Sequence, residues 1–218
     1  MKIIKQVCFS KFDNMRFVGH LDLLRMFQRA VNRSGLPVSY SQGFNPHQLV
    51  GFALPLPIGF TGRREYVDIT LDEPMDDACV VGALSVAMPD GIEISGVREV
   101  CVSSASAVVS CSYEISLQVN FDFGIIITDM LSSEEIMIKR KGKAGEQIVN
   151  ARPNIFELFQ KNGVIHITAA AGSSKSLKPE YVIGVMLERA GISCEKTSVS
   201  YTRTGFQFSG ENKAEQAE

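Results

Sequence analysis

The most regular alternation of apolar and polar positions lies between Val18 and Asn32. At about 100° per residue, one broad face of a helix would collect the apolar side chains Leu23, Leu24, Met26, Phe27, Ala30 and Val31. Gly35 is typical of a helix C-cap, and Pro37 cannot continue a helix. The pattern therefore predicts a helix with one buried face.

Apolar patterns on both sides of this helix predict further elements. Four strands are expected at residues 2–10, 49–56, 64–72 and 92–100, and a second helix at residues 76–88. The resulting order, β-α-β-β-α-β, is the split βαβ arrangement of ferredoxin-like domains. A stretch rich in Ser, Ala and Val at residues 102–110 then indicates a domain boundary.

The second half of the chain also mixes the two kinds of element. Strands are expected at residues 112–120, 135–140, 147–151, 164–170 and 194–208, and helices at residues 123–131, 154–160 and 179–190. The predicted fold class is α+β, with two ferredoxin-like units whose antiparallel sheets pack against helices. The predicted domains are residues 1–102 and 110–208, followed by a flexible tail at residues 209–218.

Composition sets limits on the class of protein. The 218 residues are 45% hydrophobic and 21% charged, which excludes wholesale disorder. A net charge of −2 excludes a globally basic nucleic-acid coat protein. The charge is unevenly spread, however: residues 1–64 hold nine basic and two acidic residues, a net charge of +7, and the remainder carries −9. This asymmetry predicts a basic face on one side of the molecule.

Several kinds of site are not expected. The five cysteines have no C-x-x-C spacing, and the three histidines lack zinc-ligand spacing, so no metal or cofactor is predicted. No P-loop, dinucleotide fingerprint or nucleophile elbow is present. No apolar run approaches the about 20 residues that span a bilayer, and the first residues lack a secretory signal. A cytoplasmic protein without a membrane partner is therefore expected.

Three arginines stand out on the polar side of the first predicted helix. Arg25, Arg29 and Arg33 are spaced at i, i+4 and i+8, with Asp22 beside them. They form either a solvated helix face or a site for phosphate groups, which guanidinium groups bind in a bidentate manner. The full set of candidate RNA- or anion-binding residues is Lys11, Arg16, Arg25, Arg29, Arg33, Ser41, Gln42, Asn45, His47 and Arg63.

The polar loop at residues 39–47 follows this helix. Its Phe44 either stacks on a base or fills the core, and the core position is favoured because buried Phe is common. An alternative catalytic site would combine His20, Asp22 and His47. The two histidines belong to the residue type that most often transfers protons near neutral pH.

Several motifs in the first 60 residues resemble a known family. Four groups of residues carry the resemblance: Phe12-Asp13-Asn14-Met15-Arg16-Phe17-Val18-Gly19-His20-Leu21-Asp22, then Arg25 and Arg29, then Tyr40-Ser41-Gln42-Gly43-Phe44-Asn45-Pro46, and Leu54-Pro55-Leu56-Pro57-Ile58-Gly59. Together they closely resemble the radical-SAM-linked protein family. That family is a bacterial domain of unknown function, found beside or fused to cobalamin-binding radical SAM proteins. The resemblance implies such a protein as a partner and supplies no reaction.

Three functions follow from these observations. The favoured one is a non-catalytic accessory module that binds RNA, such as tRNA or rRNA, through the basic amino-terminal face. The second is an enzyme that modifies RNA or a small molecule and uses His20, Asp22 and His47. The third is a protein–protein adaptor whose basic face binds an acidic partner.

Overall fold

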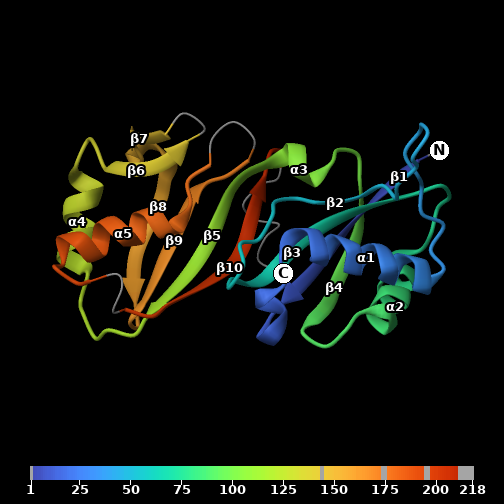
Figure 1. Cartoon of the computed structure of the whole chain (residues 1–218), viewed down its shortest axis with the longest axis horizontal. Coiled ribbons are helices and arrows are strands. Elements are labelled where there is room, and N and C mark those ends of the chain that lie inside the picture. Colours follow the sequence, from blue (N-terminus) through green and yellow to red (C-terminus); the bar gives the residue numbers. More distant parts are fainter. Residues whose placement is uncertain (1, 143–144, 173–175, 194–196, 211–218) are drawn as a thin grey trace. The chain divides into compact units, whose positions relative to one another are not determined.

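Six elements form the first part of the computed structural model, which describes residues 2–142, 145–172, 176–193 and 197–210 (Figure 1). They are β1 (Ile3–Lys11), α1 (His20–Ser34), β2 (Val50–Phe52), β3 (Thr61–Leu71), α2 (Asp77–Ala87) and β4 (Ile92–Val100). The predicted order β-α-β-β-α-β is therefore confirmed. Two short helices are added, η1 (Asp13–Phe17), a 3-10 helix, and α3 (Ser104–Ala107).

Antiparallel pairing organises these strands. β1 lies between β3 and β4, with Val7 opposite both Val67 and Val97, and β2 pairs with β3. Because side chains alternate along a strand, Val7 faces one side of the sheet and Gln6 the other. The inward side meets the apolar faces of α1 and α2 in a core that contains Phe9, Phe27, Val31, Ile69, Val80 and Leu84.

The residues on either side of helix α1 determine where it begins and ends. The carbonyl of Gly19 accepts a hydrogen bond from the Leu23 amide at 2.9 Å, which forms the first turn. Gly35 closes the helix with a left-handed φ of 70°, a conformation that glycine adopts without steric cost. The helix begins two residues later than predicted because Val18 and Gly19 have extended backbone conformations.

The second part of the chain contains β5 (Val108–Leu117), α4 (Gly124–Ser132), β6 (Met137–Gly142), β7 (Gly145–Asn150), a 3-10 helix η2 (Arg152–Asn154), β8 (Ile155–Lys161), β9 (Val164–Ala170), α5 (Pro179–Arg189) and β10 (Val199–Phe208). β9 pairs antiparallel with both β5 and β8, and β6 and β7 form a separate two-stranded sheet. The buried side chains include Ile115, Ile127, Ile165, Val182 and Met186.

The chain divides into two units after Val108, within the stretch at 102–110 where the sequence indicates a boundary. The first unit is Met1–Val108 together with the chain from Gly205, and the second is Val109–Thr204. β10 therefore contributes its last residues to the first unit, where Phe206 and Phe208 contact Tyr66. The predicted tail at 209–218 lies outside the described residues from position 211 onward.

The predicted class, α+β with mostly antiparallel strands, is confirmed, and the part of the chain that the structure describes has five α-helices. The duplication of a ferredoxin-like unit is not confirmed, because the second unit has four strands between its two main helices. None of the helices in the described ranges is long and apolar enough to cross a membrane.

One predicted helix is wrong. A helix is predicted at residues 154–160, but residues 155–160 belong to strand β8, in which Leu158 pairs with Ile167 of β9. The register shifts between Ile155 and Glu157, so the buried residues Ile155 and Leu158 are three positions apart. A β-bulge breaks the period of two, and the resulting spacing imitates one face of a helix.

Candidate nucleic-acid interface

The three arginines of α1 lie along one groove at the surface of the first unit. The groove has a volume of about 320 Å³, and its lining residues are Asp22, Arg25, Met26, Arg29, Arg33 and Pro89. Arg25, Arg29 and Arg33 are all exposed, since the opposite face of α1 is buried in the core. The helical spacing thus places three guanidinium groups side by side, as the sequence predicts.

The contacts of these arginines leave the groove positively charged. Arg25 Nη1 lies 3.0 Å from Asp22 Oδ1, in an ion pair whose side chains are 64% and 69% exposed. Such exposed pairs contribute little, about 0–1 kcal/mol, so an incoming phosphate can compete for Arg25. Arg33 Nη2 donates a hydrogen bond to the Ala87 carbonyl at 2.6 Å, which holds that side chain across to the end of α2. With one carboxylate against three guanidinium groups, the lining carries a net charge of +2.

The loop at residues 41–47 is closed by reciprocal hydrogen bonds. The Ser41 amide donates to the His47 carbonyl at 2.8 Å, the His47 amide donates to Ser41 Oγ at 3.0 Å, and Ser41 Oγ lies 2.8 Å from His47 Nδ1. Next to the loop, Gln48 Nε2 donates to Asn32 Oδ1 of α1 at 2.6 Å. The base of the loop is therefore fixed to α1 at the residue before Arg33.

The side chains at the tip of this loop point to solvent. The candidate residues Gln42 and Asn45 are exposed. Phe44 is fully exposed, at 112% of its reference area, so the expectation that it fills the core is wrong. Turn residues on both sides, Gly43 and Asn45-Pro46, hold the chain away from the core at this position.

The remaining basic candidates lie in different environments. Lys11 is completely buried, and its Nζ donates to the Val18 carbonyl at 2.9 Å. The prediction that Lys11 belongs to an RNA-binding surface is therefore wrong. The side chain is buried because alternate residues of β1 still face inward at Lys11, one position beyond the predicted strand at residues 2–10. Arg16 is exposed, with its guanidinium carbon 4.6 Å from the centre of the Phe17 ring. Arg63 is exposed on β3.

The three catalytic candidates have separate partners. The His20 ring packs against the Phe52 ring with centroids 5.4 Å apart, and its buried Nδ1 has no hydrogen-bond partner in the described ranges. Asp22 pairs with Arg25 in the groove, and His47 contacts Ser41 in the loop. Among the contacts of the described residues, none joins His20, Asp22 and His47 to one another. No cluster of three His, Cys, Asp or Glu side chains in the described part of the chain could hold a metal ion.

A buried carboxylate that the sequence analysis missed lies on the opposite face of the same sheet. Asp68, only 7% exposed, accepts hydrogen bonds from the Ser104 amide at 2.7 Å, from Ser103 Oγ at 3.1 Å and from Ser104 Oγ. Gln6 Nε2 also donates to Ser104 Oγ at 2.6 Å. Asp68 is buried because α3, which supplies Ser104, lies against it on this face of the sheet.

This network borders a cavity of about 250 Å³. The lining residues are Ile4, His47, Gln48, Leu49, Val50, Gly51, Asp68, Thr70, Ser103 and Ala105. On the same face of the sheet, burial and the neighbouring Cys8 raise the pKa of Tyr66 to about 12. The phenol of Tyr66 therefore stays protonated at neutral pH.

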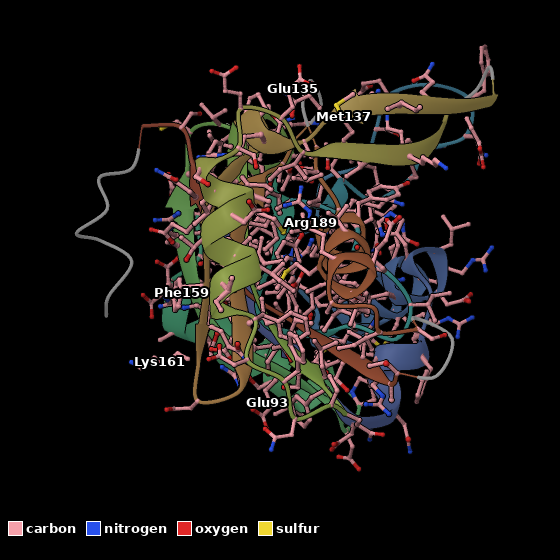
Figure 2. The ribbon with its side chains drawn as sticks, turned by 90° about the vertical axis from the view of Figure 1, so that its left-hand side faces the viewer. Glu93, Glu135, Met137, Phe159, Lys161 and Arg189 are labelled. Atoms are coloured by element: carbon pink, nitrogen blue, oxygen red, sulfur yellow. The ribbon has the colours of Figure 1, made fainter. Side chains whose placement is uncertain are left out.

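The second unit has its own surface features. On β8, the exposed Phe159 ring stacks on His166 with centroids 4.7 Å apart, and Lys161 follows on the same strand (Figure 2). Arg189 of α5 forms an ion pair with Asp129 of α4. A cavity of about 520 Å³ is lined partly by Phe121, Asp122, Phe159 and Gln160. None of these residues is among the site candidates that the sequence predicts.

Comparisons with known proteins identify one matching family model and one similar solved structure. A family model described as "Uncharacterized protein conserved in bacteria (DUF2344)" matches residues 5–179. A crystal structure of an unknown protein from Galdieria sulphuraria is similar over 93% of this chain and 99% of its own, with 14% identity and a TM-score of 0.31. No curated protein matches the chain.

Proposed function

The chain belongs to this family of uncharacterised bacterial proteins, and we propose that it is a non-catalytic accessory module that binds RNA through the basic face of its first unit. The first unit is taken as ferredoxin-like, from its order of elements. The phosphate backbone would lie along the groove of α1. The RNA would be a tRNA or an rRNA, and the protein would act with a cobalamin-binding radical SAM protein, the partner implied by the sequence resemblance.

The observation that carries the proposal is the alignment of Arg25, Arg29 and Arg33 along one exposed groove with a net charge of +2. Like charges at i, i+4 spacing destabilise a helix slightly, so the repulsion among the three arginines opposes the stability of α1. Guanidinium groups match the geometry of phosphate oxygens, and a row of them matches a polyanion better than a single small anion. The net charge of +7 in residues 1–64 adds a longer-range attraction.

A binding role also fits the catalytic candidates better than an enzymatic one. A general acid–base pair needs its groups within hydrogen-bond reach of each other or of one substrate. His20, Asp22 and His47 instead contact Phe52, Arg25 and Ser41, respectively. The enzyme hypothesis would require a substrate that connects groups with no contact of their own.

Charge reversal tests the proposal. The variant Arg25→Glu/Arg29→Glu reverses two of the three guanidinium positions, and a matched variant, Lys139→Glu/Arg140→Glu, reverses two exposed cations of β6 in the second unit. Binding of a labelled tRNA or rRNA fragment is measured by filter retention and by fluorescence anisotropy. We expect the groove variant to lose binding and the β6 variant to keep it. Circular dichroism and thermal melting should show that both variants remain folded.

The salt dependence of the wild-type protein provides a second readout. If three phosphates are neutralised, the slope of log K against log salt is about −2 for a single strand and somewhat steeper for a duplex. Binding that is insensitive to salt, or that survives the groove substitutions, refutes the proposal. Co-purification of a protein partner that persists after nuclease treatment, without RNA binding, would favour the adaptor instead.

A further inference from the structure

We propose that Phe44 is a base-stacking residue, so that the RNA bound by this protein carries an unpaired base next to the segment held in the groove of α1. This inference rests on the proposed function and specifies its substrate class: single-stranded or looped RNA rather than a continuous duplex. The position of Phe44 in the loop at residues 41–47 carries the argument.

The exposure of Phe44 is the first observation. The side chain is exposed at 112% of its reference area, more than any other large apolar side chain in the described ranges. An aromatic ring in this position gains nothing from the core of its own protein. It offers a whole π-face to an incoming group, and every nucleobase has a matching face.

The loop holds this ring at a defined place. Three contacts between Ser41 and His47 close the loop on either side of its tip. Gly43, directly before Phe44, has a φ of 122°, in a region that other residues rarely adopt. The backbone therefore makes a sharp turn at the position that projects the ring. A ring presented in this way loses less conformational freedom on binding than one on an unconstrained loop.

Cations lie at the base of the same loop. Gln48, which pairs with Tyr40 across the loop, is bonded to Asn32 of α1, and Asn32 precedes Arg33 of the groove. The exposed Lys2 Nζ donates to the Tyr40 carbonyl at 3.4 Å. Proteins that bind single-stranded nucleic acids combine a basic track for the backbone with aromatic side chains for the bases. The positive charge at the base of the loop and in the groove of α1 therefore favours a nucleic acid over an apolar protein segment as the occupant.

The absence of tryptophan from the sequence makes a direct test possible. The variant Phe44→Trp introduces a single indole at the tip of the loop, and Phe156→Trp introduces one at an exposed position of β8 in the second unit. Each variant is titrated with an oligoribonucleotide of about 12 nucleotides and with its duplex, a length within the site sizes of single-strand binders. We expect the single strand to quench and shift the emission of Phe44→Trp, and to leave that of Phe156→Trp unchanged.

Affinity supplies the second measurement. Phe44→Ala should weaken binding of the single strand by about five- to 150-fold, the range for the loss of one base–aromatic stack. Its binding of the duplex and its salt slope should match those of the wild type, because the phosphate contacts remain. Phe44→Tyr should retain the wild-type affinity, and Phe156→Ala should have no effect.

The results separate this inference from the proposed function. If the groove variant loses RNA and Phe44→Ala binds the single strand as tightly as the wild type, the stacking role is refuted while the proposed function stands. Emission of Phe44→Trp that responds to lipid vesicles or a protein partner, but not to RNA, also overturns it. If the wild-type protein binds no RNA, both are wrong.

Discussion

Replacing Asp68 by alanine should destabilise the first unit, because it removes the acceptor that anchors α3. The backbone amide of Ser104 donates to this carboxylate at 2.7 Å, and Ser104 Oγ donates as well. Each hydrogen bond to a charged group contributes about 1.5–3 kcal/mol, and a buried donor without an acceptor costs about 1–3 kcal/mol. Ser103 is exposed and can turn to water. Counting Ser104 alone, we expect the free energy of unfolding to fall by about 3–5 kcal/mol.

Removal of a buried charge also relieves its desolvation, which opposes this loss of stability. Ion pairs replaced by well-packed apolar groups are often neutral or stabilising, but alanine leaves the Ser104 donors unpaired. Asp68→Asn keeps one side-chain oxygen as an acceptor. Its amide group, a donor, replaces the other carboxylate oxygen that accepts a hydrogen bond from a serine. Its loss should therefore be smaller, about 1.5–3 kcal/mol.

Urea denaturation and thermal melting measure these losses. At about 2–4 °C per kcal/mol for a chain of this size, Asp68→Ala should lower the Tm by about 6–20 °C. The matched control is Asp90→Ala, at an exposed aspartate before β4, which should change stability by no more than about 0.5 kcal/mol. A loss below about 1 kcal/mol for Asp68→Ala would refute the assigned hydrogen bonds, and so would a loss for Asp68→Asn that exceeds the loss for Asp68→Ala.

Two further predictions concern the aromatic residues of the first unit. Phe27 is fully buried, and its ring centroid lies 4.9 Å from that of Phe9 and 5.3 Å from that of Phe52. Phe27→Ala should therefore lower the free energy of unfolding, measured by urea denaturation, by about 3–5 kcal/mol. The matched control is Phe44→Ala, which removes an exposed ring and should leave stability unchanged. The raised pKa of Tyr66, about 12 instead of 10.0, means that the folded state keeps its proton while the unfolded state loses it between these values. This residue should therefore lower stability as pH rises from 10 to 12, and ultraviolet titration should find a late tyrosinate that is missing in Tyr66→Phe. An ordinary tyrosinate titration for all five tyrosines would contradict the burial of that phenol.

The candidate surface could be predicted from the sequence because it depends on one helix. The period of the apolar residues in α1 fixes which face is buried, and the same period then fixes where Arg25, Arg29 and Arg33 point. Gly35 and Pro37 mark the end of that helix through local backbone preferences. None of these inferences needs a partner far away in the chain.

The tertiary structure decided what depends on distant segments. Lys11 is buried because β1 continues its inward alternation as far as this residue, where the Val18 carbonyl accepts the hydrogen bond of its Nζ. Asp68 is buried because α3, more than 30 residues later, covers it. The bulge that makes residues 155–161 a strand is defined only by pairing with β9. Phe44 is exposed because its loop closes on itself. Residue types and periodicity determine local conformation, whereas burial depends on which remote segment supplies the neighbouring atoms.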